Sequence, residues 1–371
     1  MSHGLRWIDE HRCDMPIFLV DVNRSSVFGS PLRNIDDATM SRYHAAIYDG
    51  CEFGCAYCEG WGILARPLNE SVRMMPHIAQ QAAAEVSVMH RDDVIGLIAD
   101  SDAYQPAEQQ YRRTRSVLTV LADRPHPVVI MTKSPFVLDD IELLQQIHAA
   151  RFAMVIVSIV SHNPEIQHKF EDKVASFAKR LALVTALKQA GIPVGVALMP
   201  LVPYINDTDY ALTQVIQQVA AAGADFLYWD FLRMPNLRHR NRMNDVMVRV
   251  GNYPISYLRE LYADGETIDS RYRGERNAAV LRICDDHRLP VRLPYPLFRG
   301  RFGPSYTVAQ IIAQQSSRDV LQGRDVLARQ GNQLAESVRA GEWPVELLKS
   351  HPTYALFREL IPTSAAGSAV L

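Results

Sequence analysis

The sequence predicts an α/β protein built on an open, partial (βα)6 barrel of the TIM type. Short apolar runs rich in Val and Ile alternate with longer stretches of helical periodicity, which is the pattern of βα units with a parallel sheet. Six such runs fall short of the eight that close a full barrel. The 371 residues, 48% of them hydrophobic, suffice for one large core with an appended lobe.

The predicted strands are the six apolar runs Ala45–Tyr48, Val94–Ala99, Val128–Met131, Met154–Ile159, Val194–Leu198 and Phe226–Trp229. The helices predicted between them lie at about His77–Met89, Pro106–Ala122, Asp139–Ala149, Val174–Ala190 and Thr208–Ala222. Gly191 and Gly223 supply helix-stop signals before two of the strands. We therefore expect an N-terminal extension, the barrel, and a mostly helical C-terminal lobe that covers the barrel mouth, at residues 1–44, 45–240 and 241–371.

Three of the five cysteines lie within eight residues, at Cys51, Cys55 and Cys58. Thiolates at this spacing on one short loop can converge on a metal centre, and three sulfur ligands leave one iron of a cubane iron–sulfur cluster without a protein ligand. That iron can bind a reactant. Zinc is an alternative, but it prefers four ligands, and neither His44 nor His77 stands at a usual finger spacing. A disulfide is less favoured, because the cysteine count is odd and no secretory signal precedes the loop.

The loop Cys-Glu-Phe-Gly-Cys-Ala-Tyr-Cys at residues 51–58 resembles the cluster loop of the radical S-adenosylmethionine (SAM) superfamily. In that family the unligated iron chelates the amino and carboxylate groups of SAM. Electron transfer into the sulfonium then releases methionine and a 5'-deoxyadenosyl radical. Gly54 and Tyr57 match the family loop, where a glycine lets the backbone approach the cluster and an aromatic side chain commonly meets the adenine. The resemblance implies a partial barrel as the core fold, and a [4Fe-4S] cluster and SAM as cofactors.

Polar residues stand at the ends of the predicted strands, where parallel barrels carry their reactive groups. A SAM site needs acceptors for the methionine ammonium, a cation for its carboxylate and polar partners for the ribose. Asp102 as a helix cap and Lys133 as a solvated side chain are open alternatives. The candidate residues at the strand ends are Ser101, Asp102, Tyr104, Lys133, Ser158 and Met199.

The stretches 102–108 and 132–140 narrow the resemblance to the branch of radical SAM proteins related to spore photoproduct lyase, over about residues 45–240. In that branch an Asp-Pro-Tyr-Gln-like turn replaces the Gly-Gly-Glu strand common elsewhere. The resemblance implies that Tyr57 and residues 101–104 lie near SAM. It further implies that Lys133 faces the SAM carboxylate, Ser158 and Arg180 the ribose side, and Met199 the adenine.

Two departures from that branch bear on the substrate. Spore photoproduct lyase uses a cysteine a few dozen residues beyond its loop to return a hydrogen atom to the thymine product, whereas this sequence has none between Cys58 and Cys284. The turn also reads Asp-Ala-Tyr in place of Asp-Pro-Tyr. The sequence therefore argues against thymine-dimer repair, and we expect Cys284 to be a buried structural thiol.

A basic run follows the sixth predicted strand. Arginine forks suit phosphate or carboxylate recognition, so the run has two interpretations: a site for an anionic substrate, or a solvated or acid-paired loop. It carries no aromatic interleaving of the kind that stacks exposed bases. The formal net charge of -2 predicts no global attraction to nucleic acid or membrane. The run comprises Arg233, Arg238, His239, Arg240 and Arg242.

These observations predict a radical SAM enzyme that abstracts hydrogen from a small, anionic or nucleotide-like substrate and takes electrons from a reductase, a flavodoxin or a ferredoxin. The alternatives are a nucleic-acid lesion lyase and a non-catalytic zinc or iron–sulfur module. A second cluster is not expected, because it needs about four more cysteines and only Cys13 and Cys284 remain. No apolar run is long enough to cross a bilayer, and we expect a cytoplasmic protein without membrane contact.

Overall fold

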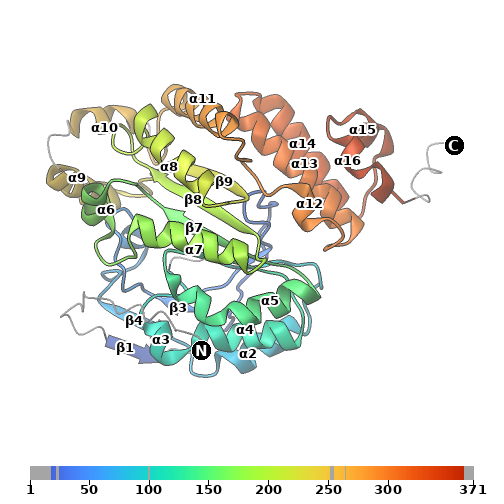
Figure 1. The fold of residues 1–371 in the computed structure, drawn as a ribbon, viewed down its shortest axis with the longest axis horizontal. Coiled ribbons are helices and arrows are strands. Elements are labelled where there is room, and N and C mark those ends of the chain that lie inside the picture. Colours follow the sequence, from blue (N-terminus) through green and yellow to red (C-terminus); the bar gives the residue numbers. More distant parts are fainter. Residues whose placement is uncertain (1–17, 22–24, 99–100, 251–254, 264, 363–371) are drawn as a thin grey trace.

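The computed structural model describes residues 18–21, 25–98, 101–250, 255–263 and 265–362. Its centre is a sheet of six parallel strands in the order β2-β5-β6-β7-β8-β9 (Figure 1). Each strand pairs with the next one of this series along the chain, as expected of successive βα units. The predicted partial barrel is therefore confirmed. The strands are β2 (Tyr43–His44), β5 (Ile95–Leu97), β6 (Val128–Thr132), β7 (Ala153–Ile159), β8 (Val194–Leu201) and β9 (Phe226–Phe231).

The first barrel strand lies earlier than predicted. Tyr43 pairs with Ile95 in β5, and the chain leaves this sheet after Ala45, whose N–H donates to the carbonyl of Gly96. Tyr48, which was predicted to end that strand, instead pairs with Met74 in a small second sheet. This sheet is composed of β1 (Phe18–Asp21), β4 (Ser71–Met74) and β3 (Tyr48–Asp49), in the order β1-β4-β3. The end of the predicted second strand, at residue 99, lies outside the described residues.

Helices between the strands cover the convex face of the large sheet (Figure 1). Strand side chains alternate between the two faces of the sheet. Val128, Ile130 and Val155 point into the core beneath these helices, whereas Val129 and Met154 belong to a second core on the concave face. The covering helices are α2 (Ile78–Val86), α4 (Arg113–Asp123), α5 (Ile141–Ala150), α7 (Phe177–Gln189) and α8 (Asp209–Ala221).

The helix predicted over residues 106–122 is two helices, α3 (Ala107–Tyr111) and α4. The break falls at Arg112, which has a φ of 49°. The carboxylate of Glu108 accepts hydrogen bonds from the backbone N–H groups of Thr114 (2.8 Å) and Arg115 (3.0 Å). Those N–H groups would otherwise lie unpaired at a helix start, so Glu108 stabilises a new beginning for α4.

Two short helices before α5 and α7 were not predicted. The first is a 3-10 helix at Pro135–Asp140, which begins after Ser134, whose hydroxyl accepts from the backbone N–H of Phe136 at 3.3 Å. The second is α6 (Pro164–Glu171), where Asn163 caps the first turn and Pro164 occupies the first helical position. Helix α6 matters for the site, because it carries Phe170 and Glu171 to the cysteine loop.

Helices form the region that follows β9. The first group is α9 (Leu237–Val250), α10 (Ile255–Leu261) and α11 (Ser270–Asp286), and α11 packs on α8. The second group lies on the right of Figure 1 and consists of α12 (Tyr295–Phe298), α13 (Pro304–Leu321), α14 (Asp325–Arg339), α15 (Val345–Ser350), α16 (Tyr354–Phe357) and a 3-10 turn at Arg358–Leu360.

The second group closes the concave face near the beginnings of the strands. Apolar side chains such as Phe298 and Val308 pack there on Val129, Met154 and Phe226. The backbone N–H of Gly303 donates to Asp92, which precedes β5, and Arg301 donates to the carbonyl of His148, which precedes β7. This end of the barrel is opposite the cysteine loop, and covering of the mouth by the C-terminal lobe stays a prediction. The division at residue 241 stays a prediction.

No helix in the described part of the chain has the length and apolar character needed to cross a membrane. The predicted cytoplasmic location stays a prediction.

Candidate active site

The cysteine loop joins β3 to the short helix α1 (Gly60–Ile63). Gly50 has a φ of 97°, and a Cβ atom at this position would lie 2.3 Å from the carbonyl oxygen of Ser71. Only glycine fits there, which lets the chain turn sharply before the first cysteine. Cys51 and Cys55 are buried, and Cys58 is half-buried. The strand end and the turn thus place all three thiols on one short, folded loop.

Three polar contacts tie this loop to the turn that follows β5. The side chain of Gln105 accepts from the N–H of Glu52 (2.8 Å) and donates to the carbonyl of Gly50 (3.1 Å). The carboxylate of Glu52 in turn accepts from the N–H of Ala107 at the start of α3. Glu52 lies in the cysteine loop and Gln105 in the Asp-Ala-Tyr-Gln turn, but neither was given a role from the sequence, because each acts on backbone groups. They hold the loop against the ends of the barrel strands.

A cavity lies between the cysteine loop and the ends of β5 and β6. It contains about 550 Å³ of empty space, including its mouth. The structure therefore brings together the three cysteines and four of the eight predicted SAM residues. The lining residues are Cys51, Phe53, Cys55, Tyr57, Cys58, Leu68, Ile98, Ser101, Asp102, Met131, Thr132 and Lys133.

Asp102 organises the strand ends at this cavity. Its carboxylate accepts from the N–H of Tyr104 (2.8 Å), the hydroxyl of Thr132 (2.7 Å) and the N–H of Lys133 (2.8 Å). Burial raises the pKa of Asp102, although Lys133 and these hydrogen bonds favour the ionised form. Asp102 is thus not the helix cap that was one alternative, but a carboxylate that links the turn after β5 to the end of β6.

Lys133 supplies the cation of the cavity. Its Nζ atom lies 5.9 Å from the centre of the Tyr57 ring, within the range of a cation–π contact. Burial alone would lower the pKa of Lys133. The acidic groups of Cys55, Glu171 and Asp102 have the larger effect, and together they raise it. The side chain is therefore not the solvated lysine that was the alternative.

Tyr57 is held by a buried polar chain. Its hydroxyl donates to Glu171 at the end of α6, and Glu171 pairs with Arg180 of α7 at 2.6 Å. Arg180 also donates to the backbone carbonyl of Ser158 in β7 (2.8 Å). Glu171 and Arg180 are almost completely buried. The guanidinium is thus engaged within the protein, and a direct contact of Ser158 or Arg180 with the ribose of SAM stays a prediction.

The remaining predicted residues lie at different distances from the cavity. Ser101 lines it and donates to the carbonyl of Tyr48 at 2.7 Å. Tyr104 points away into the core, where its hydroxyl donates to Asp140 at 3.0 Å. Met199 is half-buried near the end of β8 and packs on the concave-face core. Their contacts with SAM stay predictions.

The basic run after β9 braces the cysteine loop. His239 is buried, and its Nε2 atom lies 3.0 Å from the carbonyl oxygen of Tyr57 and 3.1 Å from that of Cys58. The guanidinium of Arg242 lies 3.5 Å from the centre of the Trp61 ring, and its Nε donates to the carbonyl of Ala56 (3.3 Å). Neither interpretation of the run describes these two residues, which bind main-chain groups of the loop.

The other members of the run are also engaged. Arg233 pairs with Glu266, Arg238 donates to the carbonyl of Leu64 (2.6 Å), and Arg240 donates to that of Gly265 (2.6 Å). Arg233 is acid-paired, as the second interpretation expected. In the sequence, only the high density of basic residues pointed to the contacts that His239 and Arg242 make with the loop.

The donor set fits a cubane cluster. Burial raises the pKa of Cys51 to about 12 and that of Cys55 well above its usual value, so these thiols favour ionisation only when positive charge is added beside them. In the part of the chain that the structure describes, no group of three His, Cys, Asp or Glu side chains could hold a single metal ion. A cubane cluster does not require such a group, because each thiolate binds a different iron.

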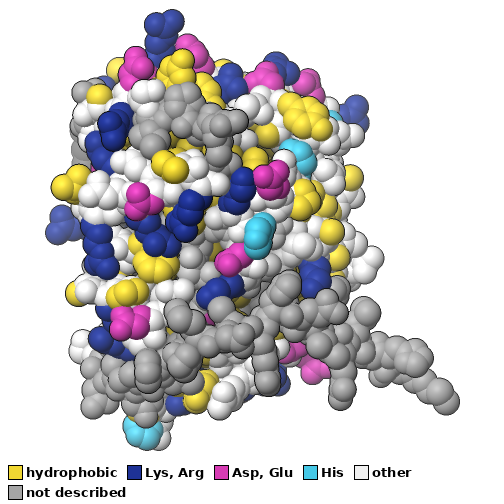
Figure 2. Space-filling view, turned by 90° about the vertical axis from the view of Figure 1, so that its left-hand side faces the viewer, with side chains coloured by type: hydrophobic (Ala, Val, Ile, Leu, Met, Phe, Trp, Pro, Cys, Tyr) yellow, Lys and Arg dark blue, Asp and Glu magenta, His cyan; other side chains and the backbone are white. Residues whose placement is uncertain are grey.

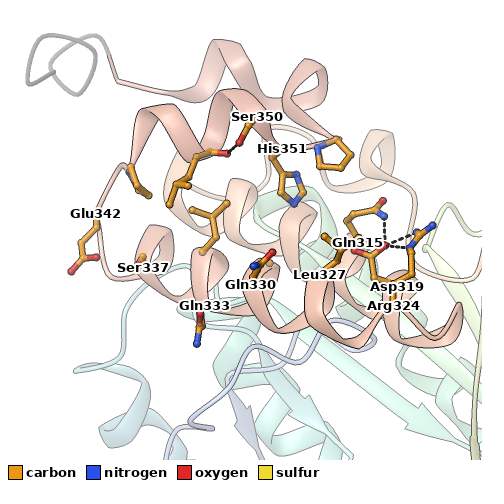
Figure 3. A pocket seen from close by; sticks show the side chains of 15 residues that line it. Gln315, Asp319, Arg324, Leu327, Gln330, Gln333, Ser337, Glu342, Ser350 and His351 are labelled. Atoms are coloured by element: carbon orange, nitrogen blue, oxygen red, sulfur yellow. Dashed lines mark hydrogen bonds and ion pairs between the residues drawn. The ribbon is translucent and has the colours of Figure 1, made fainter.

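A cavity larger than the one at the cysteine loop lies elsewhere, among the C-terminal helices (Figure 3). It is lined by polar and apolar side chains of the α13–α15 region, and among the polar ones Asp319 accepts hydrogen bonds from Gln315 and Arg324. It shares no residue with the cysteine cavity. Size alone therefore does not locate the chemistry of this protein.

Curated relatives align with most of the chain. An uncharacterized protein of Mycobacterium tuberculosis is 28% identical over 266 residues, which cover 67% of this chain and 76% of the relative. An uncharacterized protein of Methanocaldococcus jannaschii is 24% identical over 254 residues, which cover 66% of this chain and 90% of the relative.

The fold is similar to that of solved spore photoproduct lyase structures. A variant with bound AdoMet and dinucleoside spore photoproduct superposes with a TM-score of 0.57 at 17% identity, covering 72% of this chain and 79% of that one. At this identity the likeness establishes the fold alone. The family model described as the radical SAM superfamily matches residues 46–214, which span the cysteine loop and the strands β5 to β8. Residues 46–214 therefore form a radical SAM domain, and the cofactors of that family are a [4Fe-4S] cluster and SAM.

Proposed function

We propose that this protein is a radical SAM enzyme that cleaves SAM reductively and abstracts a hydrogen atom from a C–H bond of its substrate. The observation that supports this most strongly is the cavity in which Cys51, Cys55 and Cys58 face the strand-end residues Asp102 and Lys133. When bound, the cluster delivers one electron to the SAM sulfonium, which breaks the bond to C5' and yields methionine and a 5'-deoxyadenosyl radical.

The residues around the cavity divide the binding of SAM between them. Lys133 neutralises the methionine carboxylate, because it is the cation that lines the cavity. Ser101 and Asp102 offer acceptors for the ammonium group, and Tyr57 presents an aromatic face toward the adenine side. The Glu171–Arg180 pair fixes the orientation of Tyr57 through its hydroxyl.

Residues at the ends of β8 and β9 favour a planar, anionic substrate. Tyr204 follows β8, is 43% exposed, and lies 5.2 Å from the ring of Tyr272 and 6.0 Å from that of Tyr257. Arg273 lies beside Asp230 at the end of β9, with 3.4 Å between their charged atoms and nearly half of each side chain exposed. Aromatic faces bind planar rings, and an arginine fork binds phosphate or carboxylate, so a nucleotide-like molecule suits this edge.

Ligand-observed NMR can test that substrate class with a panel of nucleoside 5'-monophosphates. We expect saturation transfer to at least one of them in the wild type, and loss of the signal in Tyr204→Ala and Arg273→Met. A matched change away from the mouth, Arg329→Met on α14, should leave the signal unchanged. Equal signals in all four proteins would contradict the assignment of this edge.

Cleavage of SAM itself is tested without a substrate. The protein is reconstituted with iron and sulfide under anaerobic conditions, reduced with dithionite and incubated with SAM. We expect 5'-deoxyadenosine in the wild type and none in Cys55→Ala. Absence of 5'-deoxyadenosine from a wild-type protein that holds about four irons per chain would contradict the proposed function.

Repair of a nucleic-acid lesion is supported less well. Three members of the basic run that would have favoured it, Arg233, His239 and Arg242, are engaged with the cysteine loop or with Glu266. Cys284, the one candidate for a hydrogen-donating thiol after the loop, is completely buried in α11, and burial raises its pKa to about 12. Cys13 lies outside the described residues. A non-catalytic zinc or iron–sulfur module is the remaining alternative, and metal analysis distinguishes it from the enzyme.

A further inference from the structure

Helix α9 and the neighbouring α1 form an exposed surface directly outside the cysteine loop, here called the α9 face. Its defining side chains are those of Ile63, Leu237, Arg238, Arg242 and Arg249. Helix α9 contacts α1 and α6, and it binds the loop carbonyls through His239 and Arg242. This face is therefore attached to the same backbone that carries the cluster ligands.

The loop cysteine next to α9 is Cys58, whose carbonyl lies 3.1 Å from Nε2 of His239. Cys58 is half-buried, whereas Cys51 and Cys55 are each only 7% exposed. Trp61 of α1 lies between the loop and the face: its indole N–H donates to the carbonyl of Cys55 (2.9 Å), and Arg242 covers its ring. An electron that enters here has a short path through Trp61 or Cys58.

The charge of the face is positive. Helix α9 contains four arginines and one aspartate. Arg238, Arg242 and Arg249 stand at i, i+4 and i+11 of α9, a spacing that places them on the same side of the helix. Figure 2 views this side of the molecule and shows Lys and Arg side chains gathered across it. Such a cluster attracts an acidic partner and accelerates its association at low salt.

Apolar side chains accompany this charge. Leu237 is 71% exposed and Ile63 is 55% exposed, and both lie on the α9 face. Exposed apolar side chains beside charged ones are common in protein–protein contacts, whereas nucleic acid is held mainly by cations and stacked aromatic rings. The composition of the face therefore favours a protein over a nucleic acid.

We propose that the α9 face is the docking site of the electron donor, a small acidic flavin or iron–sulfur protein. The inference rests on the proposed function, which requires one electron for each SAM that is cleaved. The reduced donor loses that electron and the [4Fe-4S] cluster gains it, with no proton or other group transferred. The contact is expected to be small and short-lived, as is common for redox partners.

The test measures the binding of a purified flavodoxin with its FMN to the anaerobically reconstituted protein by calorimetry or biolayer interferometry. The variant Arg238→Glu/Arg249→Glu reverses two exposed charges of the face. Arg329→Glu, an exposed arginine of α14, is the matched control. We expect the double variant to bind flavodoxin at least about tenfold more weakly at low salt. The control should bind like the wild type, and added salt should weaken the wild-type complex.

A second measurement separates this inference from the proposed function. Dithionite needs no docking site, so wild type and double variant should form 5'-deoxyadenosine equally with dithionite, while flavodoxin should support the wild type alone. Failure of dithionite in the wild type would overturn the function. Equal flavodoxin binding by wild type and double variant, or no binding by the wild type at low salt, would overturn the docking site. Binding of duplex DNA that depends on Arg238 and Arg249, without flavodoxin binding, would also overturn it.

Discussion

His239 donates from Nε2 toward the main-chain carbonyl of Cys58, at 3.1 Å, and toward that of Tyr57, at 3.0 Å. The imidazole is completely buried, and its Nδ1 atom has no hydrogen-bond partner among the described residues. A side chain of α9 thus fixes the last ligand of a loop that lies about 180 residues earlier in the chain. The geometry of the cluster site depends on the helix that follows the barrel as well as on the barrel itself.

Replacing His239 by Ala removes the Nε2 donor, so the carbonyls of Tyr57 and Cys58 lose their hydrogen bonds to the imidazole. An unpaired buried polar group costs about 1–3 kcal/mol, and we expect a loss of this size in the free energy of unfolding of the cluster-free protein. Urea unfolding followed by circular dichroism measures it. We also expect less iron per chain after reconstitution and a changed electron paramagnetic resonance spectrum of the reduced cluster.

The variant His239→Gln serves as the control, because its amide nitrogen reaches about as far as Nε2. It should restore most of the iron content and the spectrum. If His239→Ala kept both the iron content and the spectrum of the wild type, the hydrogen bonds to the loop would have no role in holding the cluster.

Lys133→Met tests the assigned partner of the SAM carboxylate. The N–H of residue 133 binds Asp102 independently of its side chain, so the strand end should remain in place. A charge-assisted hydrogen bond contributes about 1.5–3 kcal/mol, and its loss should weaken SAM binding at least about tenfold. Calorimetric titration of SAM into the reconstituted variant measures this. Unchanged SAM affinity at unchanged iron content would leave the carboxylate without an assigned partner.

Arg180→Met tests whether the buried Arg180 stabilises the fold or contacts the ribose of SAM directly. Its removal leaves the buried Glu171 without its arginine partner, which should lower the free energy of unfolding by about 3–5 kcal/mol. The double variant Glu171→Gln/Arg180→Met should recover part of that loss, because no uncompensated charge remains. A large drop in SAM affinity without any loss of stability would instead support the direct ribose contact that the family resemblance implied.

Much of the barrel could be predicted from the sequence, because a buried parallel strand requires a continuous apolar run. The runs that became β6 to β9 were found with small errors at their ends. The first strand was misplaced because Tyr43 and His44 form no apolar run, and their place in the sheet is set by pairing with β5. The helix break at Arg112 was missed because Glu108 caps through its carboxylate from within the preceding helix.

The three cysteines could be predicted because a cluster needs a particular atom type at fixed spacing. Lys133 and Asp102 were found for a related reason, since strand ends deliver side chains to one edge. The brace formed by His239 and Arg242 could not be predicted, because both bind backbone carbonyls, and any residue in the loop presents the same carbonyl. Only the folded chain shows that α9 returns to the loop.

The central claim is that the loop cysteines bind a four-iron cluster that cleaves SAM. The most direct test compares the wild type with Cys51→Ala, Cys55→Ala, Cys58→Ala and, as a control, Cys13→Ala after anaerobic reconstitution. Iron and sulfide are determined, and 5'-deoxyadenosine is measured after reduction with dithionite. The wild type and Cys13→Ala should hold about four irons and four sulfides per chain and form 5'-deoxyadenosine, and the other variants should do neither. About one zinc per wild-type chain without SAM cleavage, or a Cys55→Ala protein that still holds four irons and cleaves SAM, would contradict the account.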